Sequence, residues 1–133
     1  MAYNKPIDPQ WITQGINTTA VDWANTFAKH LVPKDQHNKV EKDAALSTSQ
    51  LRKFFGQLRR IQADYERLKV EVPLLKPKLA YAVGKAKKEN RIRDFYDQME
   101  IGFKCLDGDK EKFNRFISLT EAIVAYHKFH GGE

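Results

Sequence analysis

Apolar residues recur at intervals of three and four along most of the chain, and this spacing constrains the fold more than any other feature. It is the spacing of one face of an α-helix. No segment shows the strict alternation of apolar and polar residues that marks a half-buried strand. The sequence therefore predicts an all-α fold, a compact bundle of about five helices. We expect helices at residues 18–32, 51–72, 76–88, 91–106 and 110–130, after a short helical turn at 9–12.

The strongest local signal is a helix start at Ser47. Gln50 follows three residues later, which is the pattern of a capping box, and Leu46 and Leu51 hold the two positions of a hydrophobic staple. The helix at 51–72 that begins here, and that Pro73 ends, is the longest that we expect.

Other helix ends carry weaker signals. Thr19 with Asp22 resembles a capping pair at the start of the first long helix, and Pro33 ends that helix. Pro77 is tolerable only in a first turn, which places the start of its helix near residue 76. Gly108 suits the left-handed position after a helix, and Asp109 is a good N-cap for the last one.

The whole chain of 133 residues has the length of one helical domain, with residues 1–8 as an N-terminal tail. Residues 33–46 hold three basic and three acidic side chains with few apolar ones. A segment of this composition cannot bury much apolar surface, so we expect an exposed and mobile loop there.

Several classes of protein are excluded at this point. No apolar run approaches the roughly 20 residues that a membrane span requires. Residues 1–10 contain Asp8 and two prolines and have no apolar stretch, so they do not form a signal peptide. The single cysteine, Cys105, cannot form an intrachain disulfide, which fits a reducing cytosol. We therefore expect a cytoplasmic protein without membrane contact.

The net charge of +6 is concentrated in the middle of the chain. Residues 52–93 hold 13 basic and four acidic side chains, a net charge of +9. Residues 1–51 are neutral, and residues 94–133 carry −3. This concentration favours contact with a polyanion more than the overall charge does.

Helical geometry gathers part of this charge on one side of the predicted 51–72 helix. About 100° of rotation per residue places its basic side chains opposite the apolar stripe, with Gly56 and Ala63 between them and with Asp64 and Glu66 outside the arc. Small residues flanked by guanidinium groups leave room for a phosphate backbone. A solvated face that keeps the protein soluble is the alternative. The residues of this basic arc are Arg52, Lys53, Arg59, Arg60 and Arg67.

A second basic cluster follows, on and after the 76–88 helix. Lysines of this kind would position a nucleic-acid backbone and would not read its sequence. Tyr81 falls off the inner face of the same helix and could stack on a base. A soluble helix end is an equally good interpretation. The cluster comprises Lys76, Lys78, Lys85, Lys87, Lys88, Arg91 and Arg93.

Two histidines near the end of the chain are candidates for chemistry. His127 and His130 are three residues apart and would share a helix face. Zinc needs three or four ligands, and no Cys or carboxylate cluster accompanies the pair, so we expect neither a metal nor a cofactor. Two histidines could also cleave RNA by acid–base catalysis, which leaves a small ribonuclease as an alternative.

Three stretches together resemble a known family. Residues 46–55 (LSTSQLRKFF), 74–82 (LLKPKLAYA) and 121–132 (EAIVAYHKFHGG) occur in the order and spacing of three motifs in one kind of protein. It is the small subunit of type III-A (Csm-type) CRISPR effector complexes. The resemblance covers about residues 46–132, and the first 45 residues match only as a short helical lead-in.

The resemblance implies a small helical bundle without catalytic activity. Several copies of such a subunit stack along the guide RNA–target RNA duplex of an RNA-guided ribonucleoprotein. They lie beside the backbone subunits, extend from the large signalling subunit and help to capture target RNA. A helical interaction module with a basic face for an acidic protein partner remains the alternative.

The predicted RNA-binding residues have two origins. Arg52 and Lys53 match the family's Arg-Lys pair, and Lys76 and Lys78 flank its proline. Five further residues come from helical geometry and not from the resemblance: Arg59, Arg60, Arg67, Lys85 and Lys128.

Overall fold

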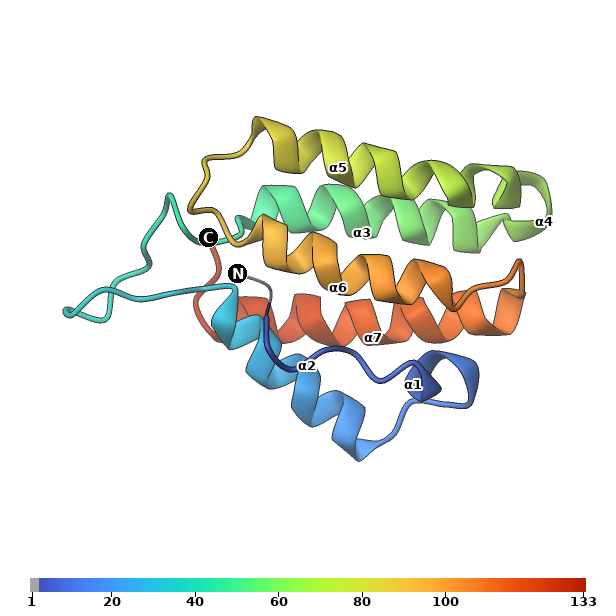
Figure 1. Cartoon of the computed structure of the whole chain (residues 1–133), viewed down its shortest axis with the longest axis horizontal. Helices are drawn as coiled ribbons and strands as arrows, with labels where there is room; N and C mark the ends of the chain where they lie inside the picture. The colour runs from blue at the N-terminus through green and yellow to red at the C-terminus, as the bar shows by residue number, and fades with distance from the viewer. Residues whose placement is uncertain (1–2) are drawn as a thin grey trace.

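The computed structural model describes residues 3–133, and these form helices and no sheet. The predicted all-α fold is therefore confirmed, and five longer helices make up the bundle (Figure 1). In chain order the elements are α1 (Gln10–Thr13), α2 (Thr18–His30), α3 (Thr48–Ala63), α4 (Tyr65–Leu68), the 3₁₀ helix η1 (Lys69–Leu74), α5 (Leu75–Lys85), α6 (Ile92–Lys104) and α7 (Lys110–Phe129).

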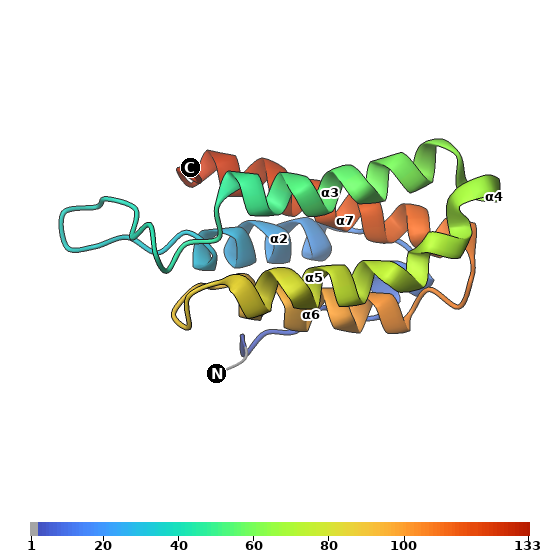
Figure 2. The same ribbon diagram turned by 90° about the horizontal axis from the view of Figure 1, so that it is seen from above.

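Helix α7 is the central element, since it packs against α1, α2 and α3 (Figure 1). Helix α5 packs against α3 and α6 (Figure 2). Aromatic side chains join the helices: the Phe54 ring of α3 meets the Phe95 ring of α6 edge-on, with centroids 5.4 Å apart. Phe103 of α6 and Phe116 of α7 are also separated by 5.4 Å. Such pairs add to the stabilisation from apolar burial.

The predicted N-terminal tail packs against this bundle in its described part. The indole Nε1–H of Trp23 donates to the Lys5 carbonyl oxygen at 2.6 Å. The buried Ile7 donates its backbone N–H to Gln98 Oε1 at 2.9 Å. Residues 1–2 of that predicted tail lie outside the described residues.

The capping box at Ser47 is confirmed. Gln50 N donates to Ser47 Oγ at 3.0 Å, and Ser47 N donates to Gln50 Oε1 at 2.8 Å. Asp109 caps α7 as predicted, and Gly108 before it has a φ of 68°, which is the left-handed region that glycine tolerates. The Thr19 capping prediction is wrong, because Asn17 accepts from Ala20 N and starts α2.

The prediction of one helix over 51–72 is wrong. Helix α3 ends at Ala63, because Asp64 leaves the helical region with φ −146° and ψ 56°. A single α-helical turn and the 3₁₀ helix η1 follow. Pro73 has no backbone N–H and its ring clashes with a helical carbonyl, so it does not fit a continuous α-helix. Helix α7, with 20 residues, is consequently the longest in the described chain.

The segment 33–46 projects from one end of the bundle (Figures 1 and 2). Its middle is exposed, but Ala45 and Leu46 at its end are buried, so the predicted exposed loop is two residues too long. An isolated bridge pairs Lys34 with Val40 across the segment. The loop ends meet where Leu46 N donates to the Leu31 carbonyl at 3.0 Å. Its predicted mobility stays a prediction.

Candidate nucleic-acid interface

The first two basic residues of α3 are available to a ligand. Arg52 and Lys53 follow the capping box by one turn, and both are exposed. Within residues 3–133, neither side chain forms an ion pair or a hydrogen bond. Gly56 lies one turn further along, and a Cβ atom built there would meet nothing within 4 Å. The surface around this glycine is open.

The other arginines of the basic arc are paired with carboxylates. Arg59 Nη1 lies 3.5 Å from Glu121 Oε2 of α7, and Arg60 pairs with Glu71 of η1. Within α3 itself, no acidic residue enters the arc. In the folded chain, Glu121 of α7 reaches it, which the rotation of one helix cannot reveal. Glu71 reaches it too. Glu71 belongs to the predicted 51–72 helix, however, and falls about five full turns after Lys53, on the same side, so the rotation already placed it in the arc.

Arg67 does not share the face of α3, because the helix breaks at Asp64. It lies on α4, where Arg67 Nε is 2.6 Å from Asp64 Oδ2. The pair is exposed, and such pairs add little stability. The prediction of five basic side chains on one helix is therefore wrong for Arg67.

The second basic cluster divides in the same way. Lys76 Nζ lies 2.8 Å from Glu100 Oε2 of α6, and this hydrogen bond raises the pKa of Lys76 and lowers that of Glu100. Lys87 Nζ is 3.0 Å from Asp43 Oδ1, which raises the pKa of Lys87. Arg91 donates to the His30 carbonyl oxygen at 2.7 Å. Each of these three residues thus links two parts of the fold: Lys76 links α5 to α6, Lys87 contacts the 33–46 loop, and Arg91 contacts α2.

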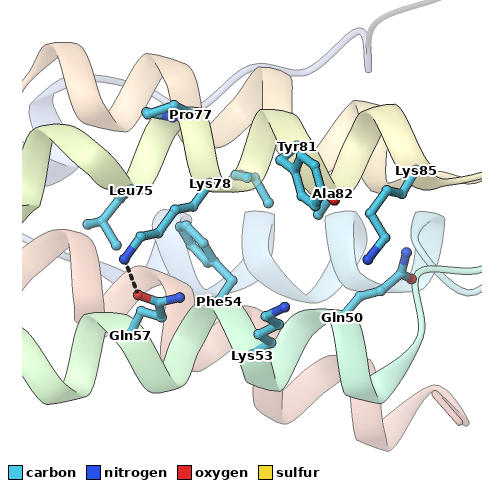
Figure 3. A pocket seen from close by; sticks show the side chains of 11 residues that line it. Gln50, Lys53, Phe54, Gln57, Leu75, Pro77, Lys78, Tyr81, Ala82 and Lys85 are labelled. Atoms are coloured by element: carbon cyan, nitrogen blue, oxygen red, sulfur yellow. Dashed lines mark hydrogen bonds between the residues drawn. The ribbon is translucent and has the colours of Figure 1, made fainter.

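Three predicted lysines do come together. Lys53 of α3 and Lys78 and Lys85 of α5 line a groove between the two helices, with a volume of about 480 Å³ (Figure 3). We call it the α3–α5 groove. No acidic residue lines it. The full lining is Gln50, Lys53, Phe54, Gln57, Leu75, Pro77, Lys78, Leu79, Tyr81, Ala82 and Lys85.

The groove combines an apolar floor with a cationic rim. Phe54 and Leu79 are buried at its floor, whereas Tyr81 is 70% exposed. Lys85 Nζ lies 5.3 Å from the centre of the Tyr81 ring, within reach of a cation–π contact. Lys78 Nζ donates to Gln57 Oε1 at 3.1 Å across the groove (Figure 3).

Gln50 and Gln57 line the groove but are not among the predicted RNA-binding residues, since both are uncharged and Gln50 was predicted only as a capping residue. Their positions carried a signal: Gln50, Lys53 and Gln57 are spaced by three and four, which places them in one row of α3. Lys128, by contrast, is exposed in the last turn of α7 and does not line the groove.

The two histidines have structural partners. His127 is buried, and its Nε2 lies 2.7 Å from the Leu46 carbonyl oxygen. His130 Nε2 lies 2.6 Å from Asn25 Oδ1. A ribonuclease built on this pair would need both rings open to the substrate, and the burial of His127 does not meet that need.

In residues 3–133, no three His, Cys, Asp or Glu side chains lie close enough to hold a metal ion. No described helix is both long and apolar enough to cross a membrane. Cys105 is half-buried, and its burial raises the pKa of the thiol.

Comparison with known proteins identifies relatives of the chain. The model of the family "Csm2 Type III-A" matches residues 20–133. A protein of Streptococcus thermophilus named "CRISPR system Cms protein Csm2" is 30% identical over 95 residues, which cover 66% of this chain and 75% of that protein. No solved structure gives a significant match. The family match also includes α2, which the three sequence motifs did not reach.

Proposed function

The chain belongs to the Csm2 Type III-A family, and on this premise we propose that it is a non-catalytic, RNA-binding subunit of a type III-A CRISPR complex that acts in antiviral defence. Several copies stack along the guide RNA–target RNA duplex and help to capture target RNA. They lie beside the backbone subunits and extend from the large signalling subunit.

One observation supports the RNA-binding part above the others. Lys53, Lys78 and Lys85 gather around a groove whose lining contains no carboxylate. Arg52, which precedes Lys53 on α3 but does not line the groove, is exposed and has no ion pair among the described residues. Cations that are not paired with carboxylates can bind phosphates and release the counterions condensed on RNA. These contacts are to the phosphate backbone of the RNA, so binding is independent of the RNA sequence.

The test compares two variants that remove the same charge from different surfaces. Arg52→Gln/Lys53→Gln/Lys78→Gln removes two lysines that line the groove and Arg52, the neighbour of Lys53 on α3. Lys5→Gln/Lys29→Gln/Lys110→Gln removes three exposed lysines that do not line the groove. Binding to single-stranded RNA is measured by fluorescence anisotropy at several salt concentrations. We expect the first variant to bind at least about 10-fold more weakly at low salt, with the salt slope reduced by about 2.

The control variant should keep most of the affinity. Equal losses in both variants would mean that only net charge matters, and would contradict a defined surface. The same pair of variants, tested for target RNA capture in the assembled complex, connects this surface to the function.

Glutamate is a poor replacement at two positions of the basic arc. Arg59→Glu would face Glu121, and Arg60→Glu would face Glu71. Repulsion between these carboxylates would disturb contacts of α3 with α7 and η1. Loss of RNA binding could then reflect the fold, so the test uses neutral substitutions at residues without ion pairs.

A further inference from the structure

The α3–α5 groove contains more than a backbone-binding surface requires. Phosphates need cations, and the lysines of its rim supply them. They do not need a hollow of about 480 Å³ with an apolar floor and an exposed tyrosine at its edge. A volume of this size is within the range of pockets that hold small ligands.

The chemistry of the lining defines the ligand. An apolar floor with an exposed tyrosine ring at its edge, cations around it and no carboxylate in the lining complements a molecule that joins an aromatic ring to an anion. A nucleotide has these two parts. An acidic peptide would use the lysines but not the Tyr81 ring, and an apolar peptide would leave three ammonium groups unused.

We propose that the α3–α5 groove holds one unpaired nucleotide of the bound RNA. The inference rests on the proposed function, since the RNA brings the nucleotide to the groove. The base packs on the Tyr81 ring above the floor formed by Phe54 and Leu79, and the adjoining phosphates contact Lys53 and Lys78. Base stacking on an exposed aromatic ring tolerates every base.

The two glutamines of the groove fit this assignment. The Oε1 atom of Gln50 accepts from Ser47 N, and that of Gln57 accepts from Lys78 Nζ. Their oxygen atoms are thus engaged, and each side chain presents its Nε2 group as a donor. Acceptors occur on the edges of all four bases, so we expect at most a weak preference among them.

The experiment uses three RNA duplexes and the full chain. One duplex is fully paired, one has a single bulged 2-aminopurine, and one has an abasic residue in the bulge. Affinity is measured by anisotropy, and stacking by the fluorescence of 2-aminopurine. We expect the wild-type protein to prefer the bulged base over the abasic bulge by roughly 10-fold and to quench the 2-aminopurine.

Variants assign this preference to the groove. Tyr81→Leu should abolish the 10-fold preference and the quenching, and Tyr81→Phe should retain both. The matched control is Phe129→Leu, because Phe129 is an equally exposed aromatic residue, 76% accessible, that does not line the groove. It should behave like the wild-type protein.

The outcomes separate this inference from the proposed function. Equal, salt-dependent binding of all three duplexes would overturn the nucleotide pocket and leave RNA binding intact. An equal loss of affinity for all three duplexes in Tyr81→Leu would also overturn the nucleotide pocket. Tyr81 would then contact the RNA backbone, or act through Lys85, and would not recognise the unpaired base. Absence of binding of the wild-type protein to any of the three duplexes would contradict both the nucleotide pocket and the proposed RNA binding.

Discussion

At the scale of the residue, His127 joins three parts of the chain. Its ring nitrogen contacts the Leu46 carbonyl just before α3, and its own carbonyl accepts from Gly132 N at 2.9 Å. A Cβ atom at Gly132 would collide with the His127 ring, so this position requires glycine. The His127 ring thus lies between Leu46, just before α3, and Gly132, just after α7.

This burial makes the stability dependent on pH. Burial lowers the pKa of His127, and the nearby Lys128 lowers it further, while the hydrogen bond to Leu46 opposes them. The unfolded chain therefore binds a proton more readily than the folded one. The free energy of unfolding should fall as the pH drops below about 6.5, the ordinary pKa of histidine.

Urea denaturation between pH 7.5 and 5 measures this effect. His127→Gln, whose amide can still donate to Leu46, should be less stable at pH 7.5 but show a weaker decline. His130 keeps part of the decline in that variant, because burial lowers its pKa too. An unchanged slope in His127→Gln would contradict the assignment.

The prediction of single residues from sequence succeeded at the starts of α3 and α7, where the partner is local, although the equally local pattern at Thr19 failed to identify the N-cap of α2. Ser47 and Gln50, and Asp109 with the following N–H groups, are separated by a few residues, so the pattern specifies the contact. Arg59 and Glu121 are 62 residues apart. Nothing in the periodicity of α3 shows which carboxylate of α7 faces it.

At the scale of the element, the break at Asp64 is the main departure from expectation. Leu58, Ile61, Tyr65 and Leu68 are all buried, as one continuous helix would require. The break preserves the phase of the apolar stripe, so periodicity could not detect it. It moves Arg67 to another element and brings Tyr65 Oη within 3.3 Å of the Gly108 carbonyl.

Two glycines in helices should respond in opposite directions to alanine. Gly56 in α3 has open space around it, so Gly56→Ala should raise the free energy of unfolding by about 1 kcal/mol through helix propensity. At Gly102 in α6, a Cβ atom would strike the Phe116 ring of α7. Gly102→Ala should lower the free energy of unfolding by about 1–3 kcal/mol.

Chemical denaturation of both variants checks these values. Each serves as the control of the other, since the covalent change is identical. A loss of stability in Gly56→Ala would mean that the added methyl group meets another part of the protein, and would contradict the open space around Gly56. RNA binding of Gly56→Ala then measures how closely a phosphate backbone approaches α3.

At the scale of the whole molecule, the helix inventory was predictable and the surface was less so. The apolar period and the capping signals located the five longer helices to within a few residues, apart from the broken one. The candidate interface depends on how α3 and α5 lie beside each other. The packing of α3 against α5 places three of the nine predicted basic residues in the lining of the groove. It also places two uncharged glutamines there, which were not predicted. Their contact with RNA stays a prediction.

The closed base of the 33–46 loop makes it a site for protein engineering. Glu41 N donates to the Pro33 carbonyl at 2.9 Å, and Leu46 N donates to the Leu31 carbonyl, so the strain of a longer loop would not reach α2 or α3. Closing a longer loop adds little entropy cost. A short Gly-Ser insertion carrying a fluorophore after His37 should leave the melting temperature within about 2 °C of the wild type.

The same insertion after Gln57, inside α3, should prevent folding and serves as the control. A labelled protein of this kind would report assembly through energy transfer between neighbouring copies, with the dye placed away from the groove. A large drop in melting temperature for the loop insertion would show that the segment supports the bundle. The loop is thus where the molecule can be lengthened without rebuilding it.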